Sequence, residues 1–304
     1  MGTASEDPLA ALPVGASIPL TPIVVGGSDA SQIPDGVINW DFFEGALLAV
    51  FLRDPESERE FQVTGTAVMI APGLAVTATH IVSESLDRLA TGRAAALLFG
   101  VRSDRADIWK IRSISHSNGD DTAYLSLELA SPIDEEWRFT TLPLTTRCPA
   151  VGEELTIVGF RMAQVEELPT GGFSPAGDLY AAAGAVANVH YPIRDTIGMP
   201  FPTIDLLCGA LHAMSGGAVL DRHGFLVGII SRSWTFTEED EGEPLTHATW
   251  IVGALGRELE IPWPPGLYPR PTHLLDVPER ALHIEGRNRI GKAEHGIQYE
   301  VWFE

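Results

Sequence analysis

Short runs of apolar residues recur along the chain, separated by glycine, proline, aspartate, serine and asparagine. Several runs alternate apolar and polar positions with a period of two, as in a strand that buries one face. Short strands at regular spacing predict an all-β barrel or sandwich. The predicted strands form two groups of six: residues 46–52, 61–70, 74–79, 94–101, 108–115 and 122–129, then residues 154–160, 181–190, 204–207, 218–220, 225–231 and 247–252.

This grouping divides the chain into five predicted parts. They are an N-terminal extension (1–36), a first barrel (37–130), a connector with three prolines (131–149), a second barrel (150–260) and a proline-rich linker with a C-terminal tail (261–304). We also expect a closing helix over residues 250–259. The alternating stretch 296–304 predicts a strand packed on a barrel or, alternatively, an element that binds a partner or regulates the protein.

Three polar residues stand beside predicted strands in distinctive settings. Ser215 follows a tight loop and precedes two glycines, which let the backbone turn sharply and approach a ligand closely. His80 ends an alanine- and threonine-rich stretch, and Asp121 opens an alternating strand. A serine becomes a good nucleophile when a base lies within reach and a third group orients that base. Ser215, His80 and Asp121 are therefore candidates for these three roles.

The order and spacing of these motifs resemble those of the trypsin-like serine peptidases, over roughly residues 37–260. The match is nearer to short prokaryotic members than to secreted digestive enzymes. The resemblance implies two six-stranded antiparallel β-barrels with the active site in the cleft between them. It also implies a serine endopeptidase that works through an acyl-enzyme and needs no cofactor.

The resemblance further implies an oxyanion hole built from the backbone N–H groups of Ala213 and Ser215. Such donors contribute roughly 3 kcal/mol each to the transition state. The family usually has glycine where this chain has Ala213. If that position needs a positive φ, alanine costs about 1 kcal/mol or more. Two alternatives follow: the hole is misformed until a partner or substrate reorganises it, or the alanine is tolerated.

The same resemblance locates the substrate-binding residues. Gly209 lies at the base of the primary pocket, and because it is not acidic, a preference for lysine or arginine is not expected. His212 lies at the pocket rim. Ser231, Arg232 and Ser233 match the edge strand that pairs with the substrate backbone. Arg232 replaces the usual aromatic residue, which would favour an acidic substrate residue nearby.

Three further features have structural interpretations. Asp120 is interpreted as a solvated loop acid, because the strand that follows alternates in register with Asp121. Residues 23–27 resemble an activated zymogen N-terminus, but Met214 occupies the position of its aspartate partner, so zymogen cleavage is not predicted. Cys208 is interpreted as a buried structural thiol, since no base motif points to it.

Composition restricts the partners. The net charge of −21 argues against nucleic acid and anionic membranes, which attract basic surfaces. Two cysteines cannot form a disulfide framework, and neither a signal peptide nor a membrane-spanning run is evident, so we expect a cytoplasmic protein. No metal or nucleotide motif occurs. The expected partners are a protein or peptide substrate and, through the C-terminal tail, an activating protein.

Two other functions fit part of the pattern. A non-catalytic binding module would keep the fold, and Ala213 weakly favours it, whereas the three intact motifs oppose it. An esterase of the α/β-hydrolase type shares the chemistry, but its residues occur in the order serine, acid, histidine, with the serine in a strand–helix unit. Here the order is His80, Asp121, Ser215, with strands on both sides.

Overall fold

The computed structural model describes residues 24–25, 43, 45–53, 61–83, 85–91, 95–101, 106–117, 119–131, 137, 139–167, 173–234, 244–259, 272–293 and 296–303. Six antiparallel strands near the N-terminal end close into a barrel in the order β2-β3-β4-β7-β6-β5. They are β2 (Leu47–Arg53), β3 (Phe61–Ala71), β4 (Leu74–Thr77), β5 (Ala95–Val101), β6 (Ala106–His116) and β7 (Ala123–Leu129). Each matches a predicted strand to within a few residues.

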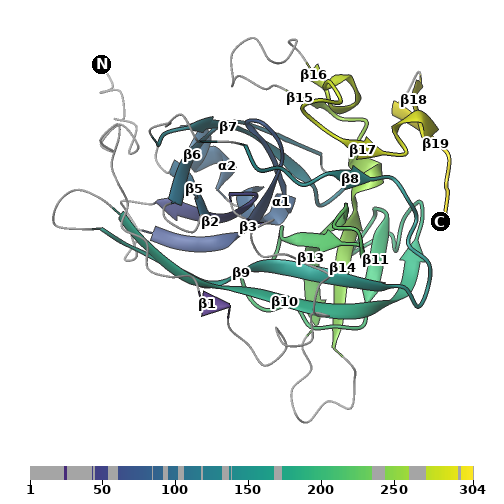
Figure 1. Ribbon diagram of the computed structural model, residues 1–304, viewed down its shortest axis with the longest axis horizontal. Helices are drawn as coiled ribbons and strands as arrows, with labels where there is room; N and C mark the ends of the chain where they lie inside the picture. Colours follow the sequence, from purple (N-terminus) through teal and green to yellow (C-terminus); the bar gives the residue numbers. More distant parts are fainter. Residues whose placement is uncertain are drawn as a thin grey trace.

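A second ring of six antiparallel strands follows in the order β12-β9-β10-β11-β14-β13, and pairing of β12 with β13 closes it. Its strands are β9 (Glu154–Glu167), β10 (Phe173–His190), β11 (Thr203–Leu206), β12 (Ala218–Leu220), β13 (Leu226–Trp234) and β14 (Leu245–Trp250). The predicted fold class of two six-stranded antiparallel barrels is therefore confirmed. Figure 1 shows the barrels side by side, with β9 and β10 reaching past the second barrel along the first.

The short helices differ from the prediction. Strand β4 ends at Thr77, and His80 lies in the helix α1 (Thr79–Ser83), which α2 (Leu86–Ala90) follows. The predicted closing helix over residues 250–259 is wrong. One 3-10 turn, η3 (Ile251–Ala254), leads instead into β15 (Glu258–Leu259). The chain extends there because β15 pairs with β16 (Thr272–His273), a partner that local periodicity does not reveal.

Three short parallel strands extend the second sheet. Strand β8 (Leu144–Thr145), inside the predicted connector, pairs with β13 and with β17 (Ile284–Glu285), and β1 (Val24–Val25) pairs with β10. The rest of the predicted N-terminal extension and residues 260–271 of the predicted linker lie outside the described residues.

The C-terminal tail forms a hairpin and packs on the connector. The 3-10 turns η4 (Leu274–Asp276) and η5 (Arg287–Arg289) lead to β18 (Ile290–Ala293) and β19 (Gly296–Tyr299). Strand β19 pairs with β18, and its Tyr299 packs on the second barrel as expected, with its ring centroid 5.6 Å from that of Trp250 in β14. Cys148 donates its backbone N–H to Trp302 O at 2.9 Å, which holds the end of the tail against the connector.

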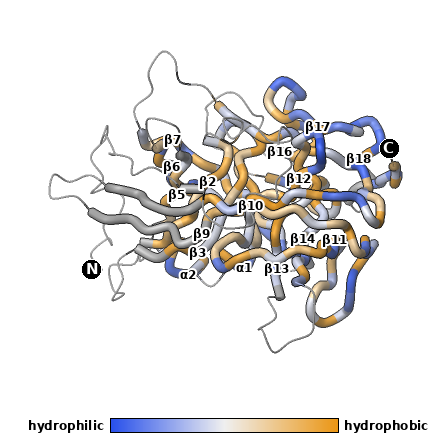
Figure 2. Tube along the Cα trace, turned by 60° about the horizontal axis from the view of Figure 1, so that its bottom comes forward, coloured by the Kyte–Doolittle hydropathy of each residue, from blue (hydrophilic) through white to orange (hydrophobic). Residues whose placement is uncertain are grey.

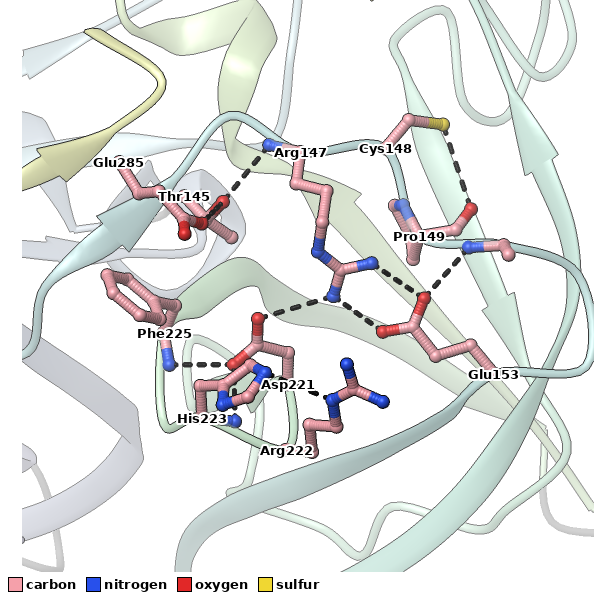
Figure 3. Close-up of polar contacts among 11 residues, drawn as sticks. Thr145, Arg147, Cys148, Pro149, Glu153, Asp221, Arg222, His223, Phe225 and Glu285 are labelled. Atoms are coloured by element: carbon pink, nitrogen blue, oxygen red, sulfur yellow. Dashed lines mark hydrogen bonds and ion pairs between the residues drawn. The ribbon is translucent and has the colours of Figure 1, made fainter. Parts of the chain in front are cut away.

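Buried hydrophobic side chains of both barrels form the core. The most hydrophilic segments lie mainly on the outer loops and the tail (Figure 2). A buried ion cluster joins the connector to the second barrel (Figure 3). Arg147, 3% exposed, donates to Glu153 at 2.5 and 2.7 Å and to Asp221 at 3.2 Å. Such a cluster anchors the chain only while the arginine and its two carboxylates are all charged. No helix within the described ranges is long and apolar enough to span a membrane.

Candidate active site

His80 and Asp121 are paired at the edge of the first barrel. His80 Nδ1 lies 2.9 Å from Asp121 Oδ2 and 3.1 Å from Oδ1. The backbone N–H of His80 also donates to Asp121 Oδ1 at 3.1 Å, so the carboxylate holds both the ring and the main chain. The Asp121 side chain is 12% exposed and that of His80 is 45% exposed. When Nδ1–H donates to the carboxylate, neutral imidazole keeps its lone pair on Nε2, ready to accept a proton.

Ser231 connects this pair to Ser215. Its hydroxyl donates to Asp121 Oδ2, and its carbonyl oxygen accepts a hydrogen bond from Ser215 Oγ at 3.4 Å. The described contacts include no hydrogen bond between Ser215 and His80. The structure therefore brings all three predicted residues to one region, with the serine hydroxyl turned toward Ser231. Sequence reasoning assigned Ser231 to substrate binding and missed its contact with Asp121, for which no local signal exists.

The loop before Ser215 ends in a tight turn. Met214 N–H donates to Leu211 O at 3.1 Å, and Ala213, the third residue of the turn, has φ of 71°. A positive φ at this position defines a type II turn, which usually has glycine there. Among the described residues other than glycine, Ala213 alone has a positive φ. The position therefore does need the left-handed conformation, and this chain places an alanine in it.

Thr66 of strand β3 holds this turn from the first barrel. Its hydroxyl donates to Ala213 O at 3.1 Å and accepts from Phe160 N–H at 2.9 Å. Its backbone N–H donates to Ser215 O at 2.8 Å. These contacts fix the Ala213 and Ser215 carbonyls, whereas the N–H groups of the same two residues make no hydrogen bond to any described residue.

Gly216 permits this close approach of the two barrels. Its φ is 78°, and a Cβ there would lie 2.1 Å from Thr66 O and 2.3 Å from Thr77 Oγ1. Real Cβ atoms essentially never come this close to another atom. The glycine after Ser215 is thus required by the backbone of the first barrel, which lies directly against it.

The prediction that Asp120 is a solvated acid is wrong. Arg257 Nη2 lies 2.7 Å from Asp120 Oδ1 and 2.6 Å from Oδ2, and the two side chains are only 12% and 15% exposed. Arg257 also donates to the carbonyls of Ser115 (3.3 Å) and Thr122. The misassignment has a simple cause: the cation lies 137 residues further along the chain, just before β15.

One guanidinium therefore holds both neighbours of Asp121. Thr122 donates its N–H to Asp120 Oδ1 at 2.9 Å, which ties the two neighbours to each other as well. Arg257 also lies over the ring of the buried Tyr124, 5.4 Å from its centroid. Burial raises the pKa of Tyr124, while Arg257 opposes that shift.

The predicted substrate-binding residues differ in exposure. His212 and Arg232 are exposed, and Gly209 is half-buried. Ser233 Oγ accepts a hydrogen bond from Ala210 N–H at 3.0 Å. Cys208, next to Gly209, is 6% exposed, and burial raises its pKa to about 11. In the described part of the chain, no group of three or more histidine, cysteine or acidic side chains could hold a metal ion.

Comparisons with known proteins identify a family and similar folds. The family described as "Trypsin-like peptidase domain" matches residues 65–229. The active form of the Rv3671c protease from M. tuberculosis is similar in structure, with a TM-score of 0.51 and 14% identity over 79% of this chain and 88% of that chain. The MamO protease domain from Magnetospirillum magneticum has a TM-score of 0.49 and 14% identity over 70% of this chain and 95% of its own. A comparison with curated protein sequences finds no match.

Proposed function

The chain belongs to the trypsin-like peptidase family, and we propose that it is a serine endopeptidase with Ser215 as the nucleophile. His80 is the general base, and Asp121 orients it. One observation carries the proposal: the Asp121 carboxylate accepts hydrogen bonds from His80 Nδ1 and from Ser231, whose carbonyl in turn holds the Ser215 hydroxyl. A base, its orienting acid and a serine hydroxyl thus lie in one continuous set of contacts.

The reaction begins when the Ser215 hydroxyl leaves Ser231 by rotation about its Cα–Cβ bond and donates to His80 Nε2. Ser215 Oγ attacks the scissile carbonyl carbon while His80 takes its proton. His80 then gives that proton to the leaving amine, and Asp121 stabilises the imidazolium in between. A water molecule, activated by His80, cleaves the acyl-enzyme and restores Ser215.

The N–H groups of Ala213 and Ser215, which bond to no described residue, support an oxyanion hole that is open at rest. In the type II turn, Thr66 holds the Ala213 carbonyl, which keeps the alanine left-handed. Two such donors contribute roughly 3 kcal/mol each to stabilisation of the transition state. The tolerated alanine is therefore our preferred alternative.

An activating partner is our second proposal, and the orientation of Ser215 favours it. The resting hydroxyl bonds to Ser231 and has no hydrogen bond to His80 among the described contacts. A partner or substrate that turns this hydroxyl toward His80 would start catalysis. The third alternative, a non-catalytic binding module, would keep the fold without an activated serine.

Labelling of the purified protein with a fluorophosphonate probe tests the proposal, with Ser215→Ala as the control. We expect labelling of the wild type that is lost in the variant. Labelling of the wild type only in the lysate of its source cells would support an activating partner. Absence of labelling in both would contradict the peptidase proposal and leave the binding module.

A further inference from the structure

Two backbone segments flank Ser215 and define where a substrate side chain enters. The loop 209–214 leads into the serine, and the end of β13, residues 231–234, lies opposite, joined by the bond from Ser215 Oγ to Ser231 O. Strand β14 pairs with one edge of this segment, whereas the other edge has no partner among the described strands. An extended peptide can add to such a free edge. The side chain just before the scissile bond then points between the two segments.

Two hydroxyl groups tie the chain before Ser215 to this sheet, one from β13 and one from β14. Ser233 Oγ, on the edge strand, accepts the N–H of Ala210 at 3.0 Å. Thr246, which lies opposite Ser233 in the β13–β14 ladder, donates its hydroxyl to Cys208 O at 2.7 Å. Thr246 is fully buried, and Ala210 is 4% exposed. Neighbouring strands therefore hold the loop close to the sheet through both hydroxyls.

We propose that Ser233 and Thr246 restrict the enzyme to substrates with a small residue, such as glycine, alanine or serine, immediately before the scissile bond. The inference rests on the proposed peptidase function and adds a substrate class to it. A large side chain has to displace the Ser233 hydroxyl and leave the buried Ala210 N–H unpaired. The loss of such a bond lowers the rate by about 10-fold to 100-fold.

The charge distribution of the loop agrees with this assignment. Residues 208–211 are cysteine, glycine, alanine and leucine, and the one ionisable side chain of the loop, His212, is exposed, so no counterion lies beside the buried Ala210. An uncompensated charge brought into this buried space would lose its hydration. Small uncharged side chains remain as the class that leaves the bond from Ala210 to Ser233 intact and needs no counterion.

Peptidyl diphenyl phosphonates test the inference, because they phosphonylate an activated serine and carry a chosen residue at the critical position. The alanine, phenylalanine and lysine reagents are compared on the full chain, beside a fluorophosphonate that has no peptide part. We expect the alanine reagent to react at least about 10-fold faster than the other two. Ser233→Gly removes the bridging hydroxyl, and we expect it to lower the alanine-to-phenylalanine rate ratio by about 10-fold or more.

A matched pair of variants on β14 distinguishes the effect of losing the hydrogen bond to Cys208 from the effect of disturbing the strand as a whole. Thr246→Val keeps the side-chain shape but removes the bond to Cys208, so the ratio should fall as in Ser233→Gly, though less. Thr249→Val changes a buried hydroxyl of the same strand that has no hydrogen-bond partner among the described residues, and the ratio should not change.

The outcomes distinguish this inference from the proposed function. If the fluorophosphonate labels Ser215 but the phenylalanine reagent reacts as fast as the alanine reagent, the inference is overturned and the peptidase proposal stands. An unchanged ratio in Ser233→Gly also overturns it. If no reagent labels Ser215, the peptidase proposal fails and the inference fails with it.

Discussion

Replacing Arg257 with methionine should weaken both the fold and the site. Methionine keeps much of the side-chain volume but removes the guanidinium. The Asp120 carboxylate then loses two hydrogen bonds of 2.6 and 2.7 Å, and the carbonyls of Ser115 and Thr122 lose their donor. Because Asp120 and Thr122 are the neighbours of Asp121, the backbone on both sides of that residue loses its support.

The expected loss of stability follows from the burial of the pair. Removing one partner of a buried ion pair costs about 3–5 kcal/mol, because the other charge stays behind. Arg257 and Asp120 keep 12% and 15% exposure, which places the expected cost near the lower end, at about 3 kcal/mol. For a domain of this size, that corresponds to a fall in Tm of about 6–12 °C.

The effect on catalysis is measured as the second-order rate of fluorophosphonate labelling, well below the Tm of each variant. A displacement of about 1 Å at a reacting group can lower a rate by about 100-fold, so we expect a 10-fold to 100-fold loss in Arg257→Met. Arg147→Met is the matched control. It breaks a buried ion cluster that makes no contact with residues 120–122, so it should lower the Tm while the labelling rate stays the same.

A double-mutant cycle assigns the effect to the ion pair. In an Asp120→Asn background no negative charge is left unpaired, so Arg257→Met should then cost less than half as much. Two results would refute the reasoning. One is that Arg257→Met lowers the Tm by less than about 2 °C. The other is that Arg257→Met slows labelling no more than Arg147→Met does. Arg257→Lys should restore part of the stability, since lysine keeps the charge but not the paired hydrogen bonds.

Four further predictions concern the remaining parts of the molecule. Ala213→Gly should change the labelling rate by less than about 3-fold, whereas a rise above 10-fold would show that alanine keeps the oxyanion hole closed. Thr66→Val, which removes the donor to the Ala213 carbonyl, should lower the Tm and slow labelling by about 10-fold, and unchanged labelling would contradict its positioning role. Burial raises the pKa values of Glu153 and Asp205, but hydrogen bonds from basic side chains outweigh it, so both lie below their usual 4.5 and 3.8. The stability from these depressed values is complete above about pH 5 and is lost as the pH falls further, so the urea midpoint should drop between pH 5 and pH 3, and a flat profile would contradict this. Cys208, with a pKa near 11, should resist iodoacetamide at pH 8 until the protein is unfolded; rapid alkylation of the native protein would show that it is not buried.

The strands and the three motifs could be predicted because their signals are local. Short apolar runs mark the barrel strands, and several of them alternate apolar and polar residues, since burial of one sheet face imposes a period of two. The sequence also raises the question whether residue 213 needs a positive φ, because the trypsin-like peptidases usually have glycine at that position. Pairing between distant strands leaves no pattern in the local sequence. A closing helix was therefore predicted where β15 forms and pairs with β16.

The sequence by itself determined the fold class and pointed to His80, Asp121 and Ser215. The period of each strand and the residues of each motif are properties of neighbouring positions, and the order of the motifs can be read along the chain. Only the tertiary structure decided how these residues are held. Thr66 reaches Ala213 across 147 positions, and Arg257 reaches Asp120 across 137. Hydrogen bonds at these separations depend on how two closed barrels pack against each other, and no pattern within either segment records that contact.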